Sequence, residues 1–323
     1  MSLDEFTLID RYFTRMPRAA AGVTLGIGDD AALLEVPAGC ELVAALDTIV
    51  EDRHFLRGAD PAAIAHRALA VNLSDLAAMG ATPAWALLAL TIPEAQAQWL
   101  EGFARGWFAL ADRFAVELVG GDTTQGPLTI SVQLSGYVER GTALRRSGAR
   151  PGDVLVVTGT LGDAAAGLEL ARTARGAGAS SAAAAELRRR FDYPEPRVAF
   201  GRVARRYASA AMDLSDGLSG DAPKLAQASG VAARIDIGRL PLSAALQGFA
   251  ARQQARDWAV SGGDYYELLL AVPPASLAAL VHEADTLGLR LTVIGECREG
   301  AGVTWSIDGA AAAAPAAGYD HFR

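Results

Sequence analysis

Six short acidic motifs are spread along this chain, and each falls where a helix or strand is expected to meet a turn. Carboxylates gathered in one site repel one another unless cations lie between them. A hard cation such as Mg²⁺ takes oxygen ligands and commonly shares them with substrate phosphates. The motifs therefore predict a site for a metal–nucleotide complex whose ligands come from distant parts of the chain. They are Gly28-Asp29-Asp30, Asp47-Thr48, Asn72-Leu73-Ser74-Asp75, Gly120-Gly121-Asp122, Asp213-Leu214-Ser215-Asp216-Gly217 and Gly262-Gly263-Asp264.

The first two motifs each allow a structural and a functional interpretation. The glycines of residues 26–32 permit a tight turn in which Asp29 and Asp30 face inward, but Asp is also a common turn residue. The apolar run 42–46 predicts a buried strand that ends at Asp47. Such strand ends favour ligand sites in α/β folds, although Asp47 can equally cap the next element.

The third motif belongs to a predicted helix over residues 61–79. Asn72 and Asp75 are three residues apart and therefore share one face of that helix. Polar side chains within the apolar stretch 68–79 need partners if they are buried. A metal site and a structural hydrogen bond both meet that need.

The later motifs follow predicted strands. Gly121 lets backbone N–H groups approach a phosphate, and Asp122 then reaches a metal ion. Residues 213–217 place two carboxylates at a strand–helix junction, where one of them or Ser215 can instead be the helix N-cap.

Two basic residues are further candidates for ligand contacts. Arg146 can pair with triphosphate oxygens or remain a surface charge. His54 lies seven residues after Asp47 and is either part of a site or a structural histidine.

The length of the chain and its pattern of apolar residues predict its fold class and number of domains. A chain of 323 residues, with 51% hydrophobic and 20% charged residues, predicts a globular protein of about two domains. Helical and strand patterns succeed one another along both halves, which predicts an α/β fold. The turn-rich segment 141–153 predicts the boundary, so we expect one domain over 1–140 and a second over 141–323. Residues 173–185 are low in complexity and predict a loop that grades into a helix.

Composition also excludes several classes of protein. A net charge of -8 argues against a nucleic-acid partner. The acidic N-terminus lacks a signal-peptide core, and no apolar run approaches the ~20 residues of a membrane span, so we expect a cytoplasmic protein. Cys40 and Cys297 form neither a disulfide framework nor a CxxC pair and are expected to be buried or partly buried thiols. The one lysine, Lys224, follows Pro223, so a Gly-Lys phosphate loop is absent.

Taken in order, the motifs resemble those of the thiamine-monophosphate kinase family, which shares a superfamily with aminoimidazole ribonucleotide synthetase and selenophosphate synthetase. The resemblance spans nearly the whole chain. It rests on GIGDDAA at 26–32, DTIVEDRHF at 47–55, AVNLSDLAAMGATPAW at 70–85, LVGGDTT at 118–124, RSGARPGD at 146–153, VTGTLGDAAAGL at 157–168, AMDLSDGLSGD at 211–221, SGGDYYELL at 261–269 and GYDHF at 318–322.

The resemblance implies a two-domain aminoimidazole ribonucleotide synthetase-like fold and direct, Mg²⁺-assisted transfer of a phosphoryl group from ATP to thiamine monophosphate. It also implies a homodimer whose N-terminal domains pack together, with ATP held between them and the C-terminal half. By motif position, the metal ligands would be Asp30, Asp47, Asp75, Asp122, Asp213 and Asp216; ATP would contact Gly121, Asp122, Arg146 and Ser215; and the thiamine phosphate would contact His54, Asp264 and Tyr319.

Two positions depart from the family pattern. Ala45-Leu46 stands where the family commonly has Ser-Thr, which removes a hydroxyl near one metal. Asp264-Tyr265 stands where it usually has Glu-Asp, which shortens one carboxylate and removes another. The alternative hypotheses are a homologue that binds Mg-ATP without turnover and one that acts on another substrate.

Overall fold

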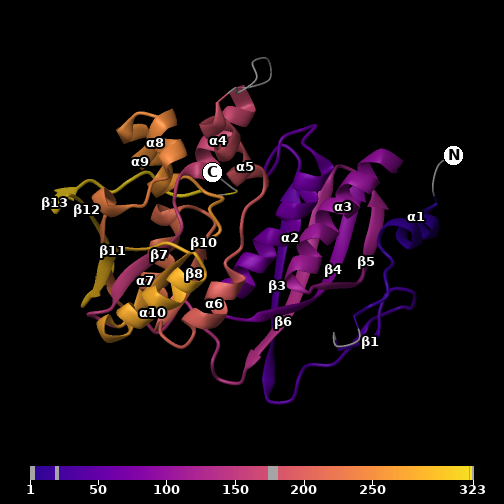
Figure 1. Ribbon diagram of the computed structural model, residues 1–323, viewed down its shortest axis with the longest axis horizontal. Coiled ribbons are helices and arrows are strands. Elements are labelled where there is room, and N and C mark those ends of the chain that lie inside the picture. The colour runs from indigo at the N-terminus through magenta and orange to yellow at the C-terminus, as the bar shows by residue number, and fades with distance from the viewer. Residues whose placement is uncertain (1–3, 19–21, 174–180, 320, 322–323) are drawn as a thin grey trace. The chain divides into compact units, whose positions relative to one another are not determined.

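The computed structural model describes residues 4–18, 22–173, 181–319 and 321. Contacts divide the chain into two compact units (Figure 1). The first unit comprises Met1–Leu76 and Ala81–Thr142, and the second comprises Ala77–Gly80 and Ala143–Arg323. Each unit combines helices with a β-sheet, as the alternating pattern predicted. Within the described residues, no helix is both long and apolar enough to cross a membrane.

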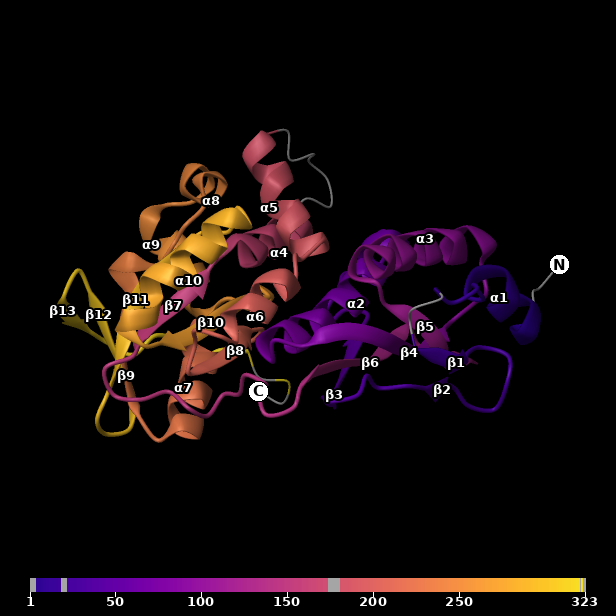
Figure 2. The same cartoon turned by 60° about the horizontal axis from the view of Figure 1, so that its bottom comes forward.

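The first unit is a four-stranded sheet with helices on one face. Its strands lie in the order β3-β6-β4-β5, in which β6 is antiparallel to β3 and β4, whereas β4 and β5 are parallel. Figure 2 shows α2 and α3 over the same face of this sheet. The elements are α1 (Glu5–Tyr12), β1 (Val23–Leu25), β2 (Leu33–Leu34), β3 (Cys40–Val50), α2 (Pro61–Ala78), β4 (Thr82–Ile92), α3 (Ala97–Phe114), β5 (Glu117–Gln125) and β6 (Thr129–Glu139).

Local sequence explains the two covering helices. Helix α2 begins at Pro61, whose fixed φ suits the first turn, and Gly80 follows its end with a φ of +67°. The amphipathic helix α3 approaches α2 closely at Gly106, where a Cβ would lie 2.2 Å from the Ala62 carbonyl oxygen. Helix α2 therefore matches the predicted helix over residues 61–79 closely.

Three predictions about the strands of the first unit were wrong. Asp47 lies inside the 11-residue strand β3 and not at its end, and β3 is a half-exposed edge strand because its residues alternate between the two faces of the sheet. Strand β5 likewise continues through Gly121 and Asp122. The motif glycines were interpreted as turns although an extended backbone accepts them. Strand β4 has no counterpart among the predicted elements, because Pro83 near its start is uncommon in the interior of a sheet.

The second unit has a seven-stranded sheet in the order β13-β12-β9-β11-β7-β10-β8. Its neighbouring strands are antiparallel except for β9 and β12. Helices α8, α9 and α10 and strands β12 and β13 were not predicted. The elements are β7 (Val154–Thr158), α4 (Asp163–Thr173), α5 (Ala182–Asp192), α6 (Val198–Ala204), β8 (Ala210–Leu214), α7 (Leu218–Ser229), β9 (Ala232–Asp236), the 3₁₀ turn η1 (Ile237–Arg239), α8 (Ala244–Phe249), α9 (Arg252–Ser261), β10 (Glu267–Val272), α10 (Pro274–Thr286), β11 (Leu291–Arg298), β12 (Gly302–Ile307) and β13 (Ala310–Ala312).

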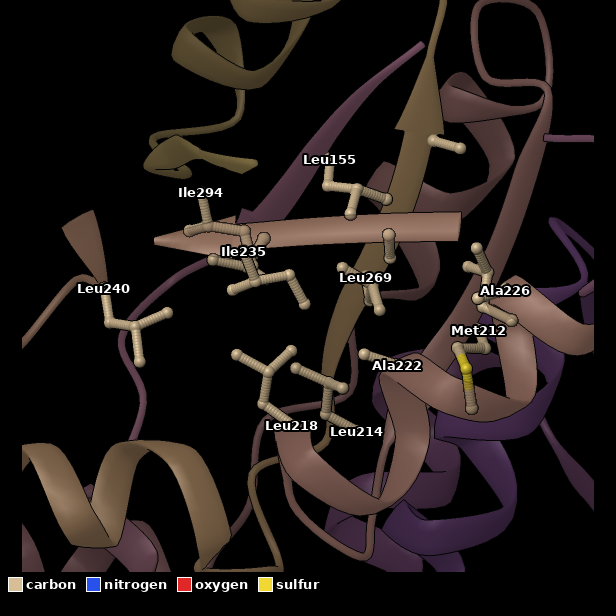
Figure 3. Close-up of a cluster of buried hydrophobic side chains, with 14 of the residues drawn as sticks. Leu155, Met212, Leu214, Leu218, Ala222, Ala226, Ile235, Leu240, Leu269 and Ile294 are labelled. Atoms are coloured by element: carbon tan, nitrogen blue, oxygen red, sulfur yellow. The ribbon is translucent and has the colours of Figure 1, made fainter. Parts of the chain in front are cut away.

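A continuous apolar core joins this sheet to α7. Figure 3 shows side chains of the sheet, such as Leu155, Ile235 and Leu269, around Leu218 and Ala222 of α7. Strand β10 is buried along its whole length, as expected for the interior of a sheet. Residues 174–180 of the predicted low-complexity loop lie outside the described residues, and α5 begins at Ala182.

Replacement of Leu269 should test this core. Leu269 is fully buried, so Leu269→Ala should lower the free energy of unfolding by about 2–5 kcal/mol. Leu287→Ala is the matched control, because Leu287 is 46% exposed after the end of α10. Urea unfolding followed by circular dichroism measures both. Equal losses for the two variants would contradict the assignment of Leu269 to the core.

Candidate functional site

Three sequence-distant segments meet in the second unit, and each carries predicted site residues. We call this arrangement the loop junction. The first segment follows β8, the second precedes β10, and the third lies close to the C-terminus. The loop junction consists of residues 213–217, 261–266 and 318–319.

Backbone hydrogen bonds hold the loop junction together. The N–H of Asp264 donates to the carbonyl oxygen of Ser215 at 2.8 Å. The N–H of Tyr319 donates to the carbonyl oxygen of Asp216 at 3.0 Å. Four predicted site residues, which come from three parts of the chain, are therefore brought together within one unit.

The segments of the loop junction approach one another so closely that two of its glycines have no room for a side chain. A Cβ on Gly263 would lie 2.6 Å from the Ser215 carbonyl oxygen. A Cβ on Gly318 would lie 2.4 Å from the Asp216 carbonyl oxygen. Glycine at these positions therefore permits the approach that the hydrogen bonds require.

Asp264 has an uncommon backbone conformation, with a φ of +66°. Tyr266 also has a positive φ, of +52°, and its hydroxyl donates to Asp264 Oδ1 at 3.1 Å. Non-glycine residues in the left-handed region are costly and cluster at functional sites. The geometry thus agrees with a ligand-facing role for the carboxylate of Asp264.

Asp213 and Asp216 differ in their exposure. Asp213 lies within β8, opposite Leu268 of β10, and is buried. The side chain of Asp216 is 33% exposed and accepts a hydrogen bond from Lys224 Nζ to Oδ2 at 2.6 Å. Lys224 Nζ also donates to Oδ1 of Asp221, at 2.8 Å. Neither Lys224 nor Asp221 was predicted as a site residue.

Burial and charge act against each other in this cluster. Burial raises the pKa of Asp221 above its usual value, although the bonds from Lys224 oppose that rise. For Lys224, burial favours the neutral amine, but the hydrogen bonds to Asp216 and Asp221 outweigh it and raise its pKa. Lys224 therefore remains an ammonium ion near neutral pH. A sequence signal was present, because Asp221 and Lys224 have the i, i+3 spacing of a helical ion pair.

Tyr265 has a packing role in the second unit. Its side chain is buried, it belongs to the apolar core of the second unit, and its hydroxyl donates to the carbonyl oxygen of Trp258. Burial raises the pKa of this phenol well above the usual value. Tyr265 therefore contributes to the core of the second unit and not to its charge.

A buried ion pair fixes the strand that follows the loop junction. Both carboxylate oxygens of Glu267 accept bonds from Arg197, and Thr158 Oγ1 donates to Oε2 at 2.6 Å. Gly159 allows this arrangement, because a Cβ there would overlap the Glu267 carboxylate. The pair anchors the first residue of β10 and so limits movement of Asp264 and Tyr266.

In the first unit, Asp30 lies in an exposed turn between β1 and β2. Its N–H donates to Oδ1 of Asp29 at 2.8 Å, and Gly28 has a φ of +119°. The turn interpretation and a ligand role are both compatible with this geometry.

Asp47 and Asp122 occupy opposite edges of the four-stranded sheet, on β3 and β5. Three strand spacings of ~4.8 Å separate these strands, or about 14 Å in all. Residues paired across neighbouring strands share one face of a sheet. Asp47 is paired with the buried Val132 and so lies on the helix-covered face, whereas Asp122 is paired with the exposed Ala89 and lies on the open face. Within one chain, the sheet therefore does not bring these two carboxylates to one ion.

Asp75 and Asn72 differ in burial although they share one stretch of α2. Asp75 is half-buried, whereas Asn72 is fully buried and its amide donates to the Ala68 carbonyl oxygen at 3.1 Å. Asn72 thus takes a structural hydrogen bond, and Asp75 remains the candidate ligand.

His54 folds back onto the end of β3. Its Nδ1 accepts a hydrogen bond from the N–H of Val50 at 3.0 Å, so a neutral ring carries its proton on Nε2. Arg146, in the second unit, is exposed, and its carbonyl oxygen accepts from Ser229 Oγ at 2.9 Å.

The donor set suits a hard cation, because every predicted metal ligand is a carboxylate. Among the described residues, however, no three His, Cys, Asp or Glu side chains are close enough to hold an ion together. A cavity of about 360 Å³ lies elsewhere in the second unit, beside Leu240, Arg252 and Arg256, and contains none of the predicted site residues. The motif residues, and not this cavity, therefore define the candidate site.

Comparisons with known proteins were made for both sequence and structure. Residues 28–138 match the family model described as AIR synthase related protein, N-terminal domain, and residues 150–307 match the corresponding C-terminal domain. The chain is 46% identical over 323 residues to the thiamine-monophosphate kinase of Salmonella typhimurium, covering 100% of this chain and 99% of the relative. It is 36% identical over 331 residues to the enzyme of the same name from Bacillus subtilis, covering 99% and 100%.

Solved structures agree with the sequence comparison. The thiamine-monophosphate kinase from Stenotrophomonas maltophilia superposes with a TM-score of 0.87 at 46% identity, covering 97% of this chain and 99% of that one. A structure described as AaThiL complexed with AMPPCP and TMP gives a TM-score of 0.78 at 36% identity and covers 92% of each chain. The predicted two-domain α/β fold is thereby confirmed.

Substitutions of Tyr265 should separate its packing role from a charged role. Tyr265→Phe should lower the free energy of unfolding by only about 1 kcal/mol, because the Trp258 carbonyl oxygen keeps its bond from the Gly262 N–H. Tyr265→Asp should destabilise the second unit far more, since it would bury a carboxylate in apolar surroundings. Thermal unfolding measures both changes. An unchanged unfolding temperature for the Tyr265→Asp variant would contradict the packing role.

Proposed function

The chain belongs to the AIR synthase related protein family, and we propose that it transfers the γ-phosphoryl group of ATP to thiamine monophosphate. The observation that carries this proposal is 46% identity to a thiamine-monophosphate kinase over the whole chain. The loop junction supports it, because it gathers Ser215, Asp264 and Tyr319 from the motifs on which the family resemblance rests.

The proposed reaction needs little covalent chemistry from the protein. An oxygen of the thiamine monophosphate phosphate attacks the γ-phosphorus of ATP, the bond to the β–γ bridging oxygen breaks, and ADP leaves. The acceptor oxygen is already ionised near neutral pH, so no general base is required. The chain's task is to position the two reactants in line and to balance their charge. Because the reaction consumes ATP, we propose that the chain works in the cytoplasm.

Three residues are proposed to contact the thiamine phosphate. Tyr319 is 47% exposed at the loop junction, and its ring can lie against the cationic thiazolium. Asp264 carries a carboxylate at the same loop junction. His54, in the first unit, is the third proposed contact, and its Nδ1 accepts a hydrogen bond from the N–H of Val50.

We propose that ATP is bound by Gly121, Asp122, Arg146 and Ser215. Gly121 has a φ of +154°, and a Cβ there would lie 1.9 Å from the Leu88 carbonyl oxygen. The bare backbone at Gly121 suits close approach of a phosphate. Arg146, which is exposed, can pair with phosphate oxygens.

We propose that Mg²⁺ is held by aspartate side chains of both units. Bound Mg²⁺ would neutralise charge on the phosphate oxygens during transfer. Only oxygen donors are present among the proposed ligands, and Mg²⁺ prefers such donors. The proposed ligands are Asp30, Asp47, Asp75, Asp122, Asp213 and Asp216.

An acceptor panel tests the proposed substrate. Release of ADP from Mg-ATP would be measured with no acceptor, with thiamine and with thiamine monophosphate. We expect ADP release to require thiamine monophosphate and to match thiamine diphosphate formation one to one. Release with another acceptor only would favour a different substrate. Tight Mg-ATP binding without any release would favour a homologue that has lost turnover.

Asp75 offers a direct test of the metal assignment. Asp75→Asn should lower turnover on the order of 100-fold, because a neutral amide cannot replace a charged ligand near the transferred phosphate. Asp10→Asn is the control, since Asp10 is an exposed carboxylate of α1 in the same unit. Turnover at saturating Mg²⁺ measures the effect. Full activity of Asp75→Asn would remove Asp75 from the proposed ligands.

We propose that the first unit forms a homodimer through the open face of its sheet. Large apolar side chains are exposed on this face, with Leu42 at 57%, Leu46 at 65% and Leu87 at 40%. Leu46, Gln133 and Leu87 form one row across three adjacent strands. A second copy of this chain is the proposed occupant, because an isologous contact buries the same leucines twice.

A two-fold axis parallel to the strands would place β5 of one copy over β3 of the other, with both strands running in the same direction. The carboxylates at the two edges of one sheet, Asp47 and Asp122, are about 14 Å apart along the sheet by strand spacing. By strand pairing, Asp122 lies on the open face of the sheet and Asp47 on the helix-covered face, so only Asp122 would lie at the proposed dimer interface.

Sedimentation velocity tests the proposed dimer. Leu46→Lys places a charge in the apolar row of the open face and should weaken dimerisation about tenfold or more. Leu287→Lys is the control, because Leu287 is a 46% exposed residue of the second unit. An unchanged dimer of the Leu46→Lys variant would contradict the proposed interface.

A further inference from the structure

Lys224 is the only lysine in a chain that has 29 basic residues, and its ammonium lies within the acidic motif after β8. Its Nζ is 2.6 Å from Asp216 Oδ2 and 2.8 Å from Asp221 Oδ1. By motif position, Asp216 is one of the proposed Mg²⁺ ligands. One oxygen of that carboxylate is already bound by a cation that belongs to the chain.

The residues around Lys224 fix its contacts with Asp216 and Asp221. Asp221 is 1% exposed, and its second oxygen accepts the N–H of Asp216 at 3.0 Å. A buried carboxylate is costly unless it is paired and hydrogen-bonded, and Lys224 supplies the charge. Lys224 and Asp221 both lie on α7, so the helix fixes the ammonium in place.

Asp216 is held on several sides as a result. Its N–H donates to Asp221, its Oδ2 accepts from Lys224, and its carbonyl oxygen accepts from the N–H of Tyr319. The bonds of Lys224 therefore reach the third segment of the loop junction through a single residue. A substitution at Lys224 should therefore alter the position of Tyr319, which is a proposed contact of the substrate.

We propose that the Lys224 ammonium is a built-in cation that takes the place of one divalent ion at Asp216. In this chain, Asp216 is then a positioning residue for Tyr319 and not a ligand of Mg²⁺. This inference rests on the proposed Mg²⁺–ATP site and corrects it at one ligand. It does not depend on thiamine monophosphate being the acceptor.

The charge arithmetic supports the substitution. Asp216 and Asp221 carry two negative charges, and the ammonium leaves this pair with one. A divalent ion placed on Asp216 would face the ammonium across a single carboxylate, and like charges at such distances repel strongly. Removal of the ammonium should therefore create a cation site where the wild type has none.

The test counts metal ions on the full-length protein without nucleotide. Mn²⁺ alone is titrated and free Mn²⁺ is read by electron paramagnetic resonance. The Lys224→Met variant should bind one more Mn²⁺ per chain than the wild type. Alternatively, the dissociation constant of its most weakly bound Mn²⁺ should fall about tenfold or more relative to the wild type. Lys224→Arg keeps the positive charge and should match the wild type. Equal titrations for all three proteins would overturn the proposal.

A second variant covers the case in which Lys224→Met does not fold. Asp216→Asn keeps the shape of the side chain and should leave the number of bound Mn²⁺ ions unchanged. Loss of one ion in Asp216→Asn would show that Asp216 is a metal ligand and would overturn the proposal. Because Mn²⁺ binding is measured without substrates, failure of the kinase assay leaves this result interpretable.

Discussion

Repulsion between like charges is the constraint on which the candidate site depends. Five aspartates are proposed to bind the metal ions and a sixth, Asp216, to hold Tyr319 in place, yet the fold keeps most of them on separate elements. Asp47 and Asp122 lie on opposite edge strands of one sheet. Asp213 is buried within β8, whereas Asp216 lies just beyond its end, where Lys224 neutralises part of the charge. Within each unit, the fold thus separates or neutralises carboxylates that would otherwise repel one another.

The two departures from the family pattern both concern packing. Leu46 is 65% exposed and stands in a row of the open sheet face, so its apolar side chain contributes to the surface that we propose for the dimer. Tyr265 fills the core of the second unit and satisfies its hydroxyl on a backbone carbonyl. Asp264 supplies a carboxylate at the loop junction. Leu46 and Tyr265 therefore contribute to packing, whereas the candidate polar residues of the site are present.

Residue types and motif order were enough to select the candidate residues, because few chemistries use so many carboxylates with glycines. Their placement was harder to predict. Glycine before Asp122 indicated a turn, yet glycine also fits an extended strand beside a neighbouring backbone, as at Gly121. The role of Lys224 depends on a contact with Asp216, eight residues away, which requires the turn at Gly217 to be known. Sheet order, which separates Asp47 from Asp122, arises from pairing between distant strands and has no local signal.

The origin of the transferred phosphoryl group is the most direct test of the proposed kinase. ATP whose three non-bridging γ-oxygens are ¹⁸O would be incubated with thiamine monophosphate, Mg²⁺ and the purified protein, and the products would be weighed by mass spectrometry. Direct transfer predicts thiamine diphosphate that carries all three labelled oxygens. Labelled inorganic phosphate, with no labelled thiamine diphosphate, would contradict it.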